Sequence, residues 1–256
     1  MKRFVTLLCS VMILFAGIGK MTEAEEMNMT ENQRRIVESS TLDPERVKKG
    51  VLMPHEEVLL RCVEEAERYL AARYPDERFV FQQTTGNMGM PSATGYRFLV
   101  KAENACIEAE VRVFLAEDGN VSCSDDYCAY TYRQELNEYI EKLMTDAGYT
   151  GVRSAMLLGG VYGAEIDVRQ SLVQLIAEGK AFFVTGSMYL PDGVQVCAQD
   201  IQSVLSGNGL YGTTAVYTLL DMPDGEAKRE WGREYPQLVT ERIFLQIESR
   251  TDGSVE

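Results

Sequence analysis

The feature that most constrains the fold is a segment in which apolar and polar residues alternate. Residues 107–116 place Ile, Ala, Val, Val and Leu at every second position, with charged residues and one phenylalanine between them. Side chains of a β-strand point to opposite faces in turn, so this pattern predicts a half-buried strand. Residues 117–120, Glu-Asp-Gly-Asn, follow as a hairpin turn, because Asp-Gly tolerates positive φ. The segment therefore indicates an antiparallel sheet with one face in water.

Helical patterns flank this strand. A helix is predicted to begin near Pro54, and its apolar stripe continues to residue 70. A second helix is predicted over residues 132–147, with a capping box at Thr131 and Gln134 and with Gly148 at its end. Further strands are predicted over residues 79–84, 96–102 and 121–127. Helix, strands and helix in this order indicate helices packed on an antiparallel sheet.

The second half of the chain repeats these patterns. Strands are predicted over residues 154–158, 181–190, 213–220 and 239–247. Helices are predicted over residues 226–234 and over 168–178 with Asp167 as its cap. A helix is also predicted over residues 194–205, although Val194, Val196 and Ala198 alternate like a returning strand. The fold class is therefore α+β, with helices packed on antiparallel sheets in one or two modules after an N-terminal apolar leader.

The first residues predict export. Lys2 and Arg3 precede an uncharged, mostly apolar run over residues 4–19, and Lys20 follows it. A membrane span needs about 17–25 apolar residues, and a signal-peptide core needs about 7–15. Three interpretations stay open: a signal peptide cut after Ala24, a retained anchor, and a cytoplasmic protein with an apolar tail. The predicted location is secreted or cell-envelope, anchored by residues 4–19 if the leader is retained.

Composition shifts divide the rest of the chain. We predict a signal peptide or membrane anchor over residues 1–24, a polar tether over 25–52, an α+β module over 53–150 and a second α+β module over 151–256. The boundary near residues 148–151 is equally consistent with a loop inside one domain.

The charge balance excludes one class of partner. The chain has 25 basic and 39 acidic residues, a net charge of −14, and the body after residue 20 is more acidic still. Binding to a nucleic-acid backbone needs a basic face, so no nucleic-acid partner is predicted. The membrane is contacted only through the N-terminal segment if that segment is uncleaved. The acidic body is consistent with a soluble exported surface or with attraction of cations.

The cysteines allow a small disulfide loop. Cys123 and Cys128 are separated by four residues, and an exported protein commonly forms disulfides, so they are the disulfide candidates; unpaired structural thiols are the alternative. Cys62 lies on an apolar helix face and is predicted to be in the core. No metal site is predicted, because no second close cysteine pair exists and His55 is the only histidine.

Catalytic motifs are weak in this sequence. The glycine-rich residues 158–163 match neither the dinucleotide nor the phosphate-loop spacing, so a simple turn is favoured and no cofactor is predicted. Asp125 and Asp126 are the densest carboxylate pair available to a hydrolase. They carry the alternative hypothesis of an enzyme outside the membrane.

Two segments are candidates for binding. Residues 86–95 have almost no charge and are predicted to form a loop, with Asn87, Met88, Met90 and Pro91 as the binding-loop candidates. Residues 228–236 place Trp231 and Tyr235 beside arginines, which is frequent in protein interfaces, although such aromatics also cover core edges.

The sequence therefore predicts an exported or membrane-tethered, non-enzymatic binding protein. Its predicted partner is a protein or peptide outside the membrane. The alternatives are an extracytoplasmic carboxylate-dependent hydrolase and a protein that binds a small ligand or a cation.

Overall fold

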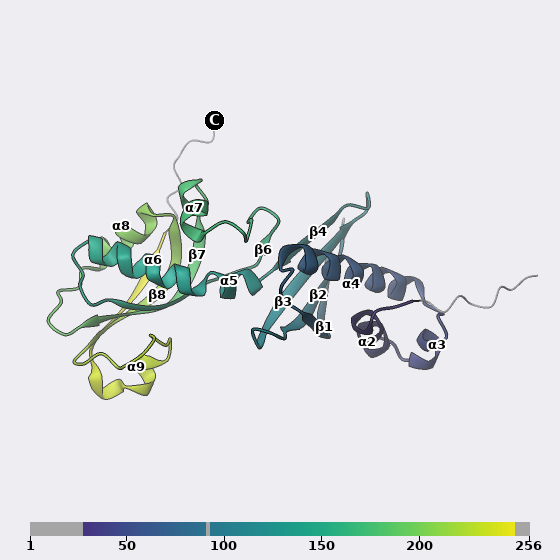
Figure 1. Cartoon of the computed structure of the whole chain (residues 1–256), viewed down its shortest axis with the longest axis horizontal. Coiled ribbons are helices and arrows are strands. Elements are labelled where there is room, and N and C mark those ends of the chain that lie inside the picture. Colours follow the sequence, from purple (N-terminus) through teal and green to yellow (C-terminus); the bar gives the residue numbers. More distant parts are fainter. Residues whose placement is uncertain (1–27, 91–92, 249–256) are drawn as a thin grey trace, which may run out of the picture.

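The computed structural model describes residues 28–90 and 93–248, which form two sheets along the long axis of the molecule (Figure 1). Sheet A contains five strands in the order β1-β2-β3-β4-β6, and sheet B contains four in the order β5-β7-β8-β9. Helices pack against both sheets. The α+β fold class is confirmed.

Sheet A is an antiparallel meander that packs on one long helix. Its strands are β1 (Phe79–Met90), β2 (Ala93–Ala102), β3 (Ile107–Ala116), β4 (Val121–Asp125) and β6 (Tyr162–Gly163). The alternating segment is β3, and Ala109, Val111 and Val113 are buried as predicted. Helix α4 (Pro54–Arg73) begins at the predicted proline and buries its apolar stripe, including Cys62, against this face.

The predicted polar tether is folded over much of its length. Helices α2 (Glu31–Ser39) and α3 (Pro44–Lys48) occupy this part of the chain. Ile36, Val37 and Val47 are fully buried. The side-chain amide of Asn32 accepts from the backbone N–H of Phe81 (3.1 Å) and donates to the carbonyl of Phe79 (3.1 Å), so α2 occupies the outer edge of β1. A tether is therefore the wrong description of residues 31–48.

Sheet B is mixed rather than wholly antiparallel. Its strands are β5 (Arg153–Leu158), β7 (Phe182–Pro191), β8 (Leu210–Leu219) and β9 (Val239–Ile247). Strands β7 and β8 run parallel because α8 (Ala198–Gly207) connects them as a crossover; the other pairs are antiparallel. Helices α6 (Arg133–Asp146) and α8 lie on one side of the sheet, and α9 (Trp231–Glu234) lies on the other (Figure 1).

The predicted boundary between modules does not follow the fold. Helix α6 precedes residue 150 but packs on sheet B, where Leu136, Ile140 and Met144 join the core. Conversely, β6 follows residue 150 but pairs with β4 of sheet A. The short helix α5 (Tyr127–Thr131) lies between the two sheets (Figure 1). The chain therefore passes from sheet A to sheet B near residue 126 and returns once.

Two predicted helix caps are wrong. The helix predicted after Asp167 is α7 (Leu172–Ala177), which is capped by Ser171 through a capping box with Gln174. Helix α6 has no side-chain cap, because the Thr131 hydroxyl instead donates to the carbonyl of Cys128. Helix α7 lies between β6 and β7, and a short 3₁₀ helix (Pro236–Leu238) directly precedes β9.

No helix within residues 28–90 and 93–248 is long and apolar enough to span a membrane. The predicted leader and cleavage position lie outside the described residues.

Candidate functional site

One face of sheet B is only partly covered, and the candidate site lies there. Along β7, Phe182 and Val184 face the core under α6 and α8, so Phe183, Thr185 and Ser187 face the other side. Strand register continues this face across the sheet in rows. Its two middle rows consist of Leu157, Thr185, Thr213 and Gln246, and of Ala155, Ser187, Ala215 and Phe244. Most of these side chains are short, so space remains above the strands.

The chain between β8 and β9, residues 220–238, crosses this face, and we call it the strap. Trp231 of the strap is only 2% exposed, and its ring lies 5.4 Å from the ring of Tyr189. The Tyr189 hydroxyl donates to the carbonyls of Lys228 (2.7 Å) and Arg229 (3.0 Å). The hydroxyl of Ser187 also donates to the Arg229 carbonyl, at 3.4 Å. The sheet therefore fixes the strap backbone directly beside the uncovered rows.

A glycine lets the strap lie close to the sheet. A Cβ atom on Gly232 would lie 2.4 Å from the ring of Tyr217, well inside contact distance. Only a residue without a side chain fits there unless the tyrosine ring moves. Gly232 and Trp231 together set the height of the strap, and thus the position of the side chains on either side of them.

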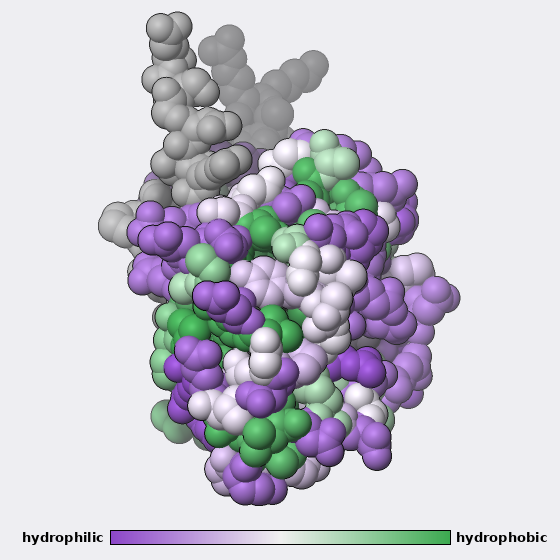
Figure 2. All heavy atoms as spheres, turned by 90° about the vertical axis from the view of Figure 1, so that its left-hand side faces the viewer, coloured by the Kyte–Doolittle hydropathy of each residue, from purple (hydrophilic) through white to green (hydrophobic). Residues whose placement is uncertain are grey.

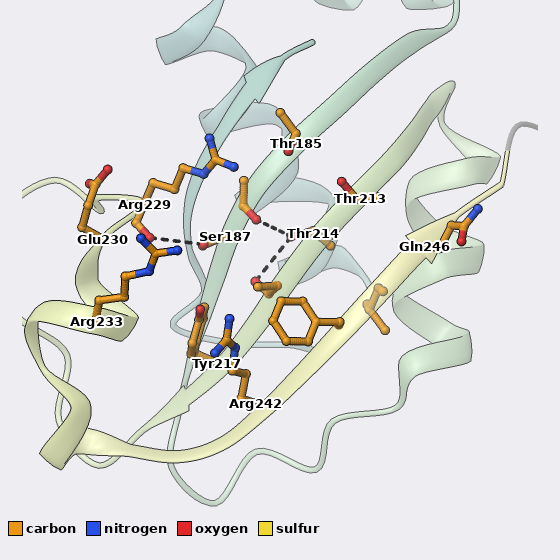
Figure 3. A pocket seen from close by; sticks show the side chains of 14 residues that line it. Thr185, Ser187, Thr213, Thr214, Tyr217, Arg229, Glu230, Arg233, Arg242 and Gln246 are labelled. Atoms are coloured by element: carbon orange, nitrogen blue, oxygen red, sulfur yellow. Dashed lines mark hydrogen bonds between the residues drawn. The ribbon is translucent and has the colours of Figure 1, made fainter.

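The strap and the uncovered rows enclose a pocket of about 730 Å³. Arg229 and Arg233 extend from the strap toward β7, whereas the carboxylate of Glu230 points away from the strands (Figure 3). Arg242 rises from β9 beside Tyr217 (Figure 3). The lining also includes the hydroxyl-bearing side chains of Thr185, Ser187 and Thr213.

One arginine of this pocket, Arg242, is held by aromatic rings rather than by a carboxylate. The Arg242 guanidinium lies 4.1 Å from the ring centre of Phe244 and 5.2 Å from that of Tyr217. Cation–π contacts orient the group while leaving its N–H donors free to bind other groups. In the described part of the chain, Arg229, Arg233 and Arg242 form no ion pair. A protein of net charge −14 therefore carries a locally positive pocket.

This arrangement is suited to binding an anion. Guanidinium groups present several N–H donors in a plane and match carboxylate or phosphate oxygens in pairs. The hydroxyls of Thr185, Ser187 and Thr213 lie on the same face and can donate further hydrogen bonds. Seen from the end that carries α8 and α9, apolar residues form separate patches among polar ones (Figure 2). This end therefore offers charged and hydrogen-bonding groups as well as apolar contacts.

The predicted binding loop is a hairpin instead. Asn87, Met88 and Met90 belong to β1. In the register of the two strands they lie opposite Tyr96, Gly95 and Ala93 of β2, respectively. Pro91 lies outside the described residues. The prediction of a ten-residue loop is wrong, because backbone pairing continues almost to the tip of the hairpin.

The structure does not join the predicted disulfide pair. Cys123 on β4 packs against the core of sheet A, whereas Cys128 on α5 belongs to the core of sheet B. Both thiols are free, as are those of Cys62, Cys106 and Cys197. Burial raises the pKa of Cys123 and of Cys128 to about 12, so both remain protonated. Protonated thiols are poor at forming disulfides.

Asp125 is a buried structural carboxylate. Its oxygens accept from the hydroxyls of Tyr69 (2.6 Å) and Tyr74 (2.8 Å), and from the backbone N–H of Cys128 (3.0 Å). Arg73 forms an ion pair with it at 3.3 Å and also donates to the carbonyl of residue 166. Burial, and then the nearby carboxylate, raise the pKa of Tyr69 and of Tyr74, so both hydroxyls remain donors.

Asp126 is also engaged with the backbone. Its side chain accepts from the N–H of Glu110 at 2.7 Å, and burial raises its pKa. Neither aspartate lines the pocket on sheet B. The two carboxylates proposed for hydrolysis therefore join strands and helices, and the structure gives them no shared site.

The remaining motifs, His55 and the glycine-rich residues, have structural positions outside the pocket. His55 is an exposed residue in the first turn of α4. The glycine-rich residues 158–163 connect β5 to β6, and Gly163 donates its N–H to Glu165 at 2.8 Å. Within the described ranges, no group of three or more metal-binding side chains is positioned to hold an ion.

Sequence reasoning missed most of the pocket. The segment around Trp231 was recognised as either an interface or a core edge, and it is both: the tryptophan is buried while Arg229 and Arg233 line the pocket. A second signal was present in β7, where Thr185 and Ser187 alternate with apolar residues and mark one polar face. Nothing local in the sequence indicated that Arg242 would join them.

Comparison of the chain with models of protein families, with curated proteins and with solved structures finds no match.

Proposed function

We propose that this protein is a non-enzymatic binding protein that holds the anionic group of a ligand in the pocket on sheet B. The observation that carries the proposal is the set of three arginines, without carboxylate partners among the described residues, around a hydroxyl-bearing floor. Pockets of about 300–1,000 Å³ are typical of small-molecule sites, and 730 Å³ lies within this range. The leader motivates the accompanying proposal that the protein works outside the membrane.

Titration calorimetry with inorganic phosphate, sulfate and citrate tests the proposal. We expect saturable binding of at least one anion to the full chain, with one site per molecule. Arg233→Gln combined with Arg242→Gln should weaken that binding at least tenfold, about 1.4 kcal/mol, because each removes a charged donor. Raising the salt concentration should weaken binding as well, since the pocket is open to water.

Two further variants control for general charge effects. Arg133→Gln removes a positive charge from an exposed position on α6, outside the pocket, and should leave the affinity within twofold. Gln246→Glu adds a carboxylate to the pocket face and should weaken anion binding without changing the fold. If the double variant bound anions as the wild type does, the pocket would not be the binding site.

A further inference from the structure

The uncovered face continues past the pocket onto exposed aromatic side chains. One row beyond Thr185 and Thr213, the strand register places Phe183 opposite Tyr211, on the same face of the sheet. Their rings meet edge to face with centres 5.7 Å apart. Phe244, in the row of Ser187, is 69% exposed. We call these three residues the aromatic shelf.

The aromatic shelf is held in place although it is open to water. A Cβ atom on Gly159 would lie 2.4 Å from the Phe183 ring, so this ring rests directly on the backbone of the β5 edge. Phe183 is nonetheless 37% exposed. Phe244 is fixed from its own strand by the Arg242 guanidinium at 4.1 Å. Fixed and exposed aromatic rings beside a pocket are typical of surfaces that contact a ligand.

Charge and apolar surface are separated along the strands. The arginines lie at the strap end of the pocket, and Phe183 and Tyr211 lie at the opposite end of the same face. The row of Ala215 and the row of Tyr211 are four residues apart on β8, which corresponds to about 13 Å. Between them the floor carries short side chains such as Thr213. A ligand that spans this face therefore meets positive charge at one end, the side chains of Thr185, Thr213 and Gln246 in the middle and aromatic rings at the far end.

We propose that the ligand of this pocket is a soluble carboxylate with an apolar chain of medium length. The carboxylate lies among Arg229, Arg233 and Arg242, and the chain extends over Phe244 toward Phe183 and Tyr211. This inference rests on the proposed anion-binding function and names its class of ligand. Phe183 and Tyr211 lie one row beyond Thr185 and Thr213 on the pocket face, and this apolar end, with positive charge at the other end, supports this occupant over a purely polar anion.

Calorimetry with acetate, butanoate, hexanoate and octanoate tests the proposal on the full chain in a non-ionic detergent. Burying one methylene completely strengthens binding about fourfold. The shelf is open on one side, so we expect about half of that free energy, or about twofold for each methylene. Octanoate should therefore bind about 50-fold more tightly than acetate. The double variant Arg233→Gln, Arg242→Gln is titrated in the same micelles as the control, because the signal that remains without the site reports partitioning of the fatty acid into the detergent.

Variants on the shelf separate the chain contact from the anion contact. Phe183→Ser should weaken octanoate binding about fivefold and leave acetate binding unchanged. Leu220→Ser removes an apolar side chain that is 59% exposed but lies outside the pocket, and should alter neither. Octylamine should not bind, because it carries the opposite charge at the same chain length.

The outcomes distinguish the two proposals. Equal affinity for acetate and octanoate would overturn the apolar chain while leaving anion binding intact. Failure of every anion to bind would overturn the function itself. Equal binding of octanoate and octyl sulfate, or tighter binding of a glutamate-rich peptide than of octanoate, would assign the pocket to another ligand class and overturn the proposal.

Discussion

The two sheets treat the charges on their uncovered faces in opposite ways. On sheet A, Glu110 pairs with Arg112 at 2.7 Å and with Arg97 at 4.0 Å. Lys101 lies opposite Glu108 in the register of β2 and β3. Opposite charges on neighbouring strands stabilise a sheet modestly and satisfy each other. The charges on this face are largely paired, although the buried Nε of Arg97 has no hydrogen-bond partner among the described residues.

Sheet B leaves its arginines without such partners among the described residues. Arg242 contacts aromatic rings, and the strap adds Arg229 and Arg233 above the same floor. Three positive charges that lie near one another repel unless an anion joins them. This difference between the sheets is the basis of the proposal that a ligand binds on sheet B.

The largest effect is expected from removing Trp231, the buried side chain that anchors the strap to sheet B. Trp231→Ala should lower the free energy of unfolding by about 4 kcal/mol, because it empties a buried site between strap and sheet. Anion binding should be lost with it, since Arg229 and Arg233 would no longer be positioned. Urea unfolding followed by circular dichroism measures the first effect, and calorimetry the second. Phe244→Ala, at an exposed position, should cost less than about 1 kcal/mol.

The buried network beside sheet A gives the next effect. Asp125→Asn should lower the free energy of unfolding by about 3 kcal/mol, because Arg73 would keep its charge without its partner. Asp118→Asn, in the exposed turn before β4, is the control and should cost less than about 0.5 kcal/mol. Anion binding on sheet B should be unchanged in both. A stable Asp125→Asn protein that lost anion binding would contradict the separate roles of the two sheets.

Acid should affect the sheet A side first. Glu56 is buried, and its hydrogen bond with Arg46 lowers its pKa from 4.5 to about 2. A lowered pKa in the folded state means that the stabilisation is present above pH 4.5 and is lost as the pH falls toward 2. Glu56→Gln should cost about 2 kcal/mol at neutral pH.

Unfolding curves recorded between pH 7 and pH 2 test this. The difference between wild type and Glu56→Gln should shrink across the window from 4.5 to 2. Glu31→Gln, which breaks an exposed pair with Arg35, should show almost no difference at any pH. A constant difference for Glu56→Gln would show that lost packing, and not charge, is responsible.

The smallest effect is expected from a substitution that removes the carboxylate shared by the charge pairs of sheet A. Glu110→Gln should cost only about 0.5 kcal/mol, because this pair is partly exposed. It leaves Arg97 and Arg112 without their carboxylate. We expect calorimetry still to show one anion site per molecule, since sheet A has no strap to enclose a ligand. A second anion site would show that unpaired arginines alone are sufficient.

Local patterns predicted the elements whose apolar residues are regularly spaced. The alternation of β3, the Asp-Gly turn after it and the limits of β9 follow the sequence closely. Helix α2 was missed because Ile36 and Val37 are almost the only apolar residues in a polar segment. The hairpin at residues 86–95 was missed because its strands are held by backbone pairing and carry little alternation.

The candidate site was predicted least well because it depends on distant contacts. Trp231 and its neighbouring arginines were visible as a segment, but their position follows from Tyr189 and Gly232. Arg242 reaches the pocket only through the register of β8 and β9. The register between neighbouring strands is not encoded in any short stretch of residues, so the residues that line the pocket could not be predicted from local patterns.

The return of β6 to sheet A has a practical consequence for anyone who cuts this chain. A fragment that ends near residue 150 lacks both β6 and the carbonyl of Ile166 that Arg73 binds. The complementary fragment lacks α6 and would expose the core of sheet B to water. Expression of either half alone should give insoluble or protease-sensitive material. Tags and fusion partners belong instead in an exposed turn such as the one at Gly119, which joins β3 to β4 and keeps all the strands and helices of both sheets in one chain.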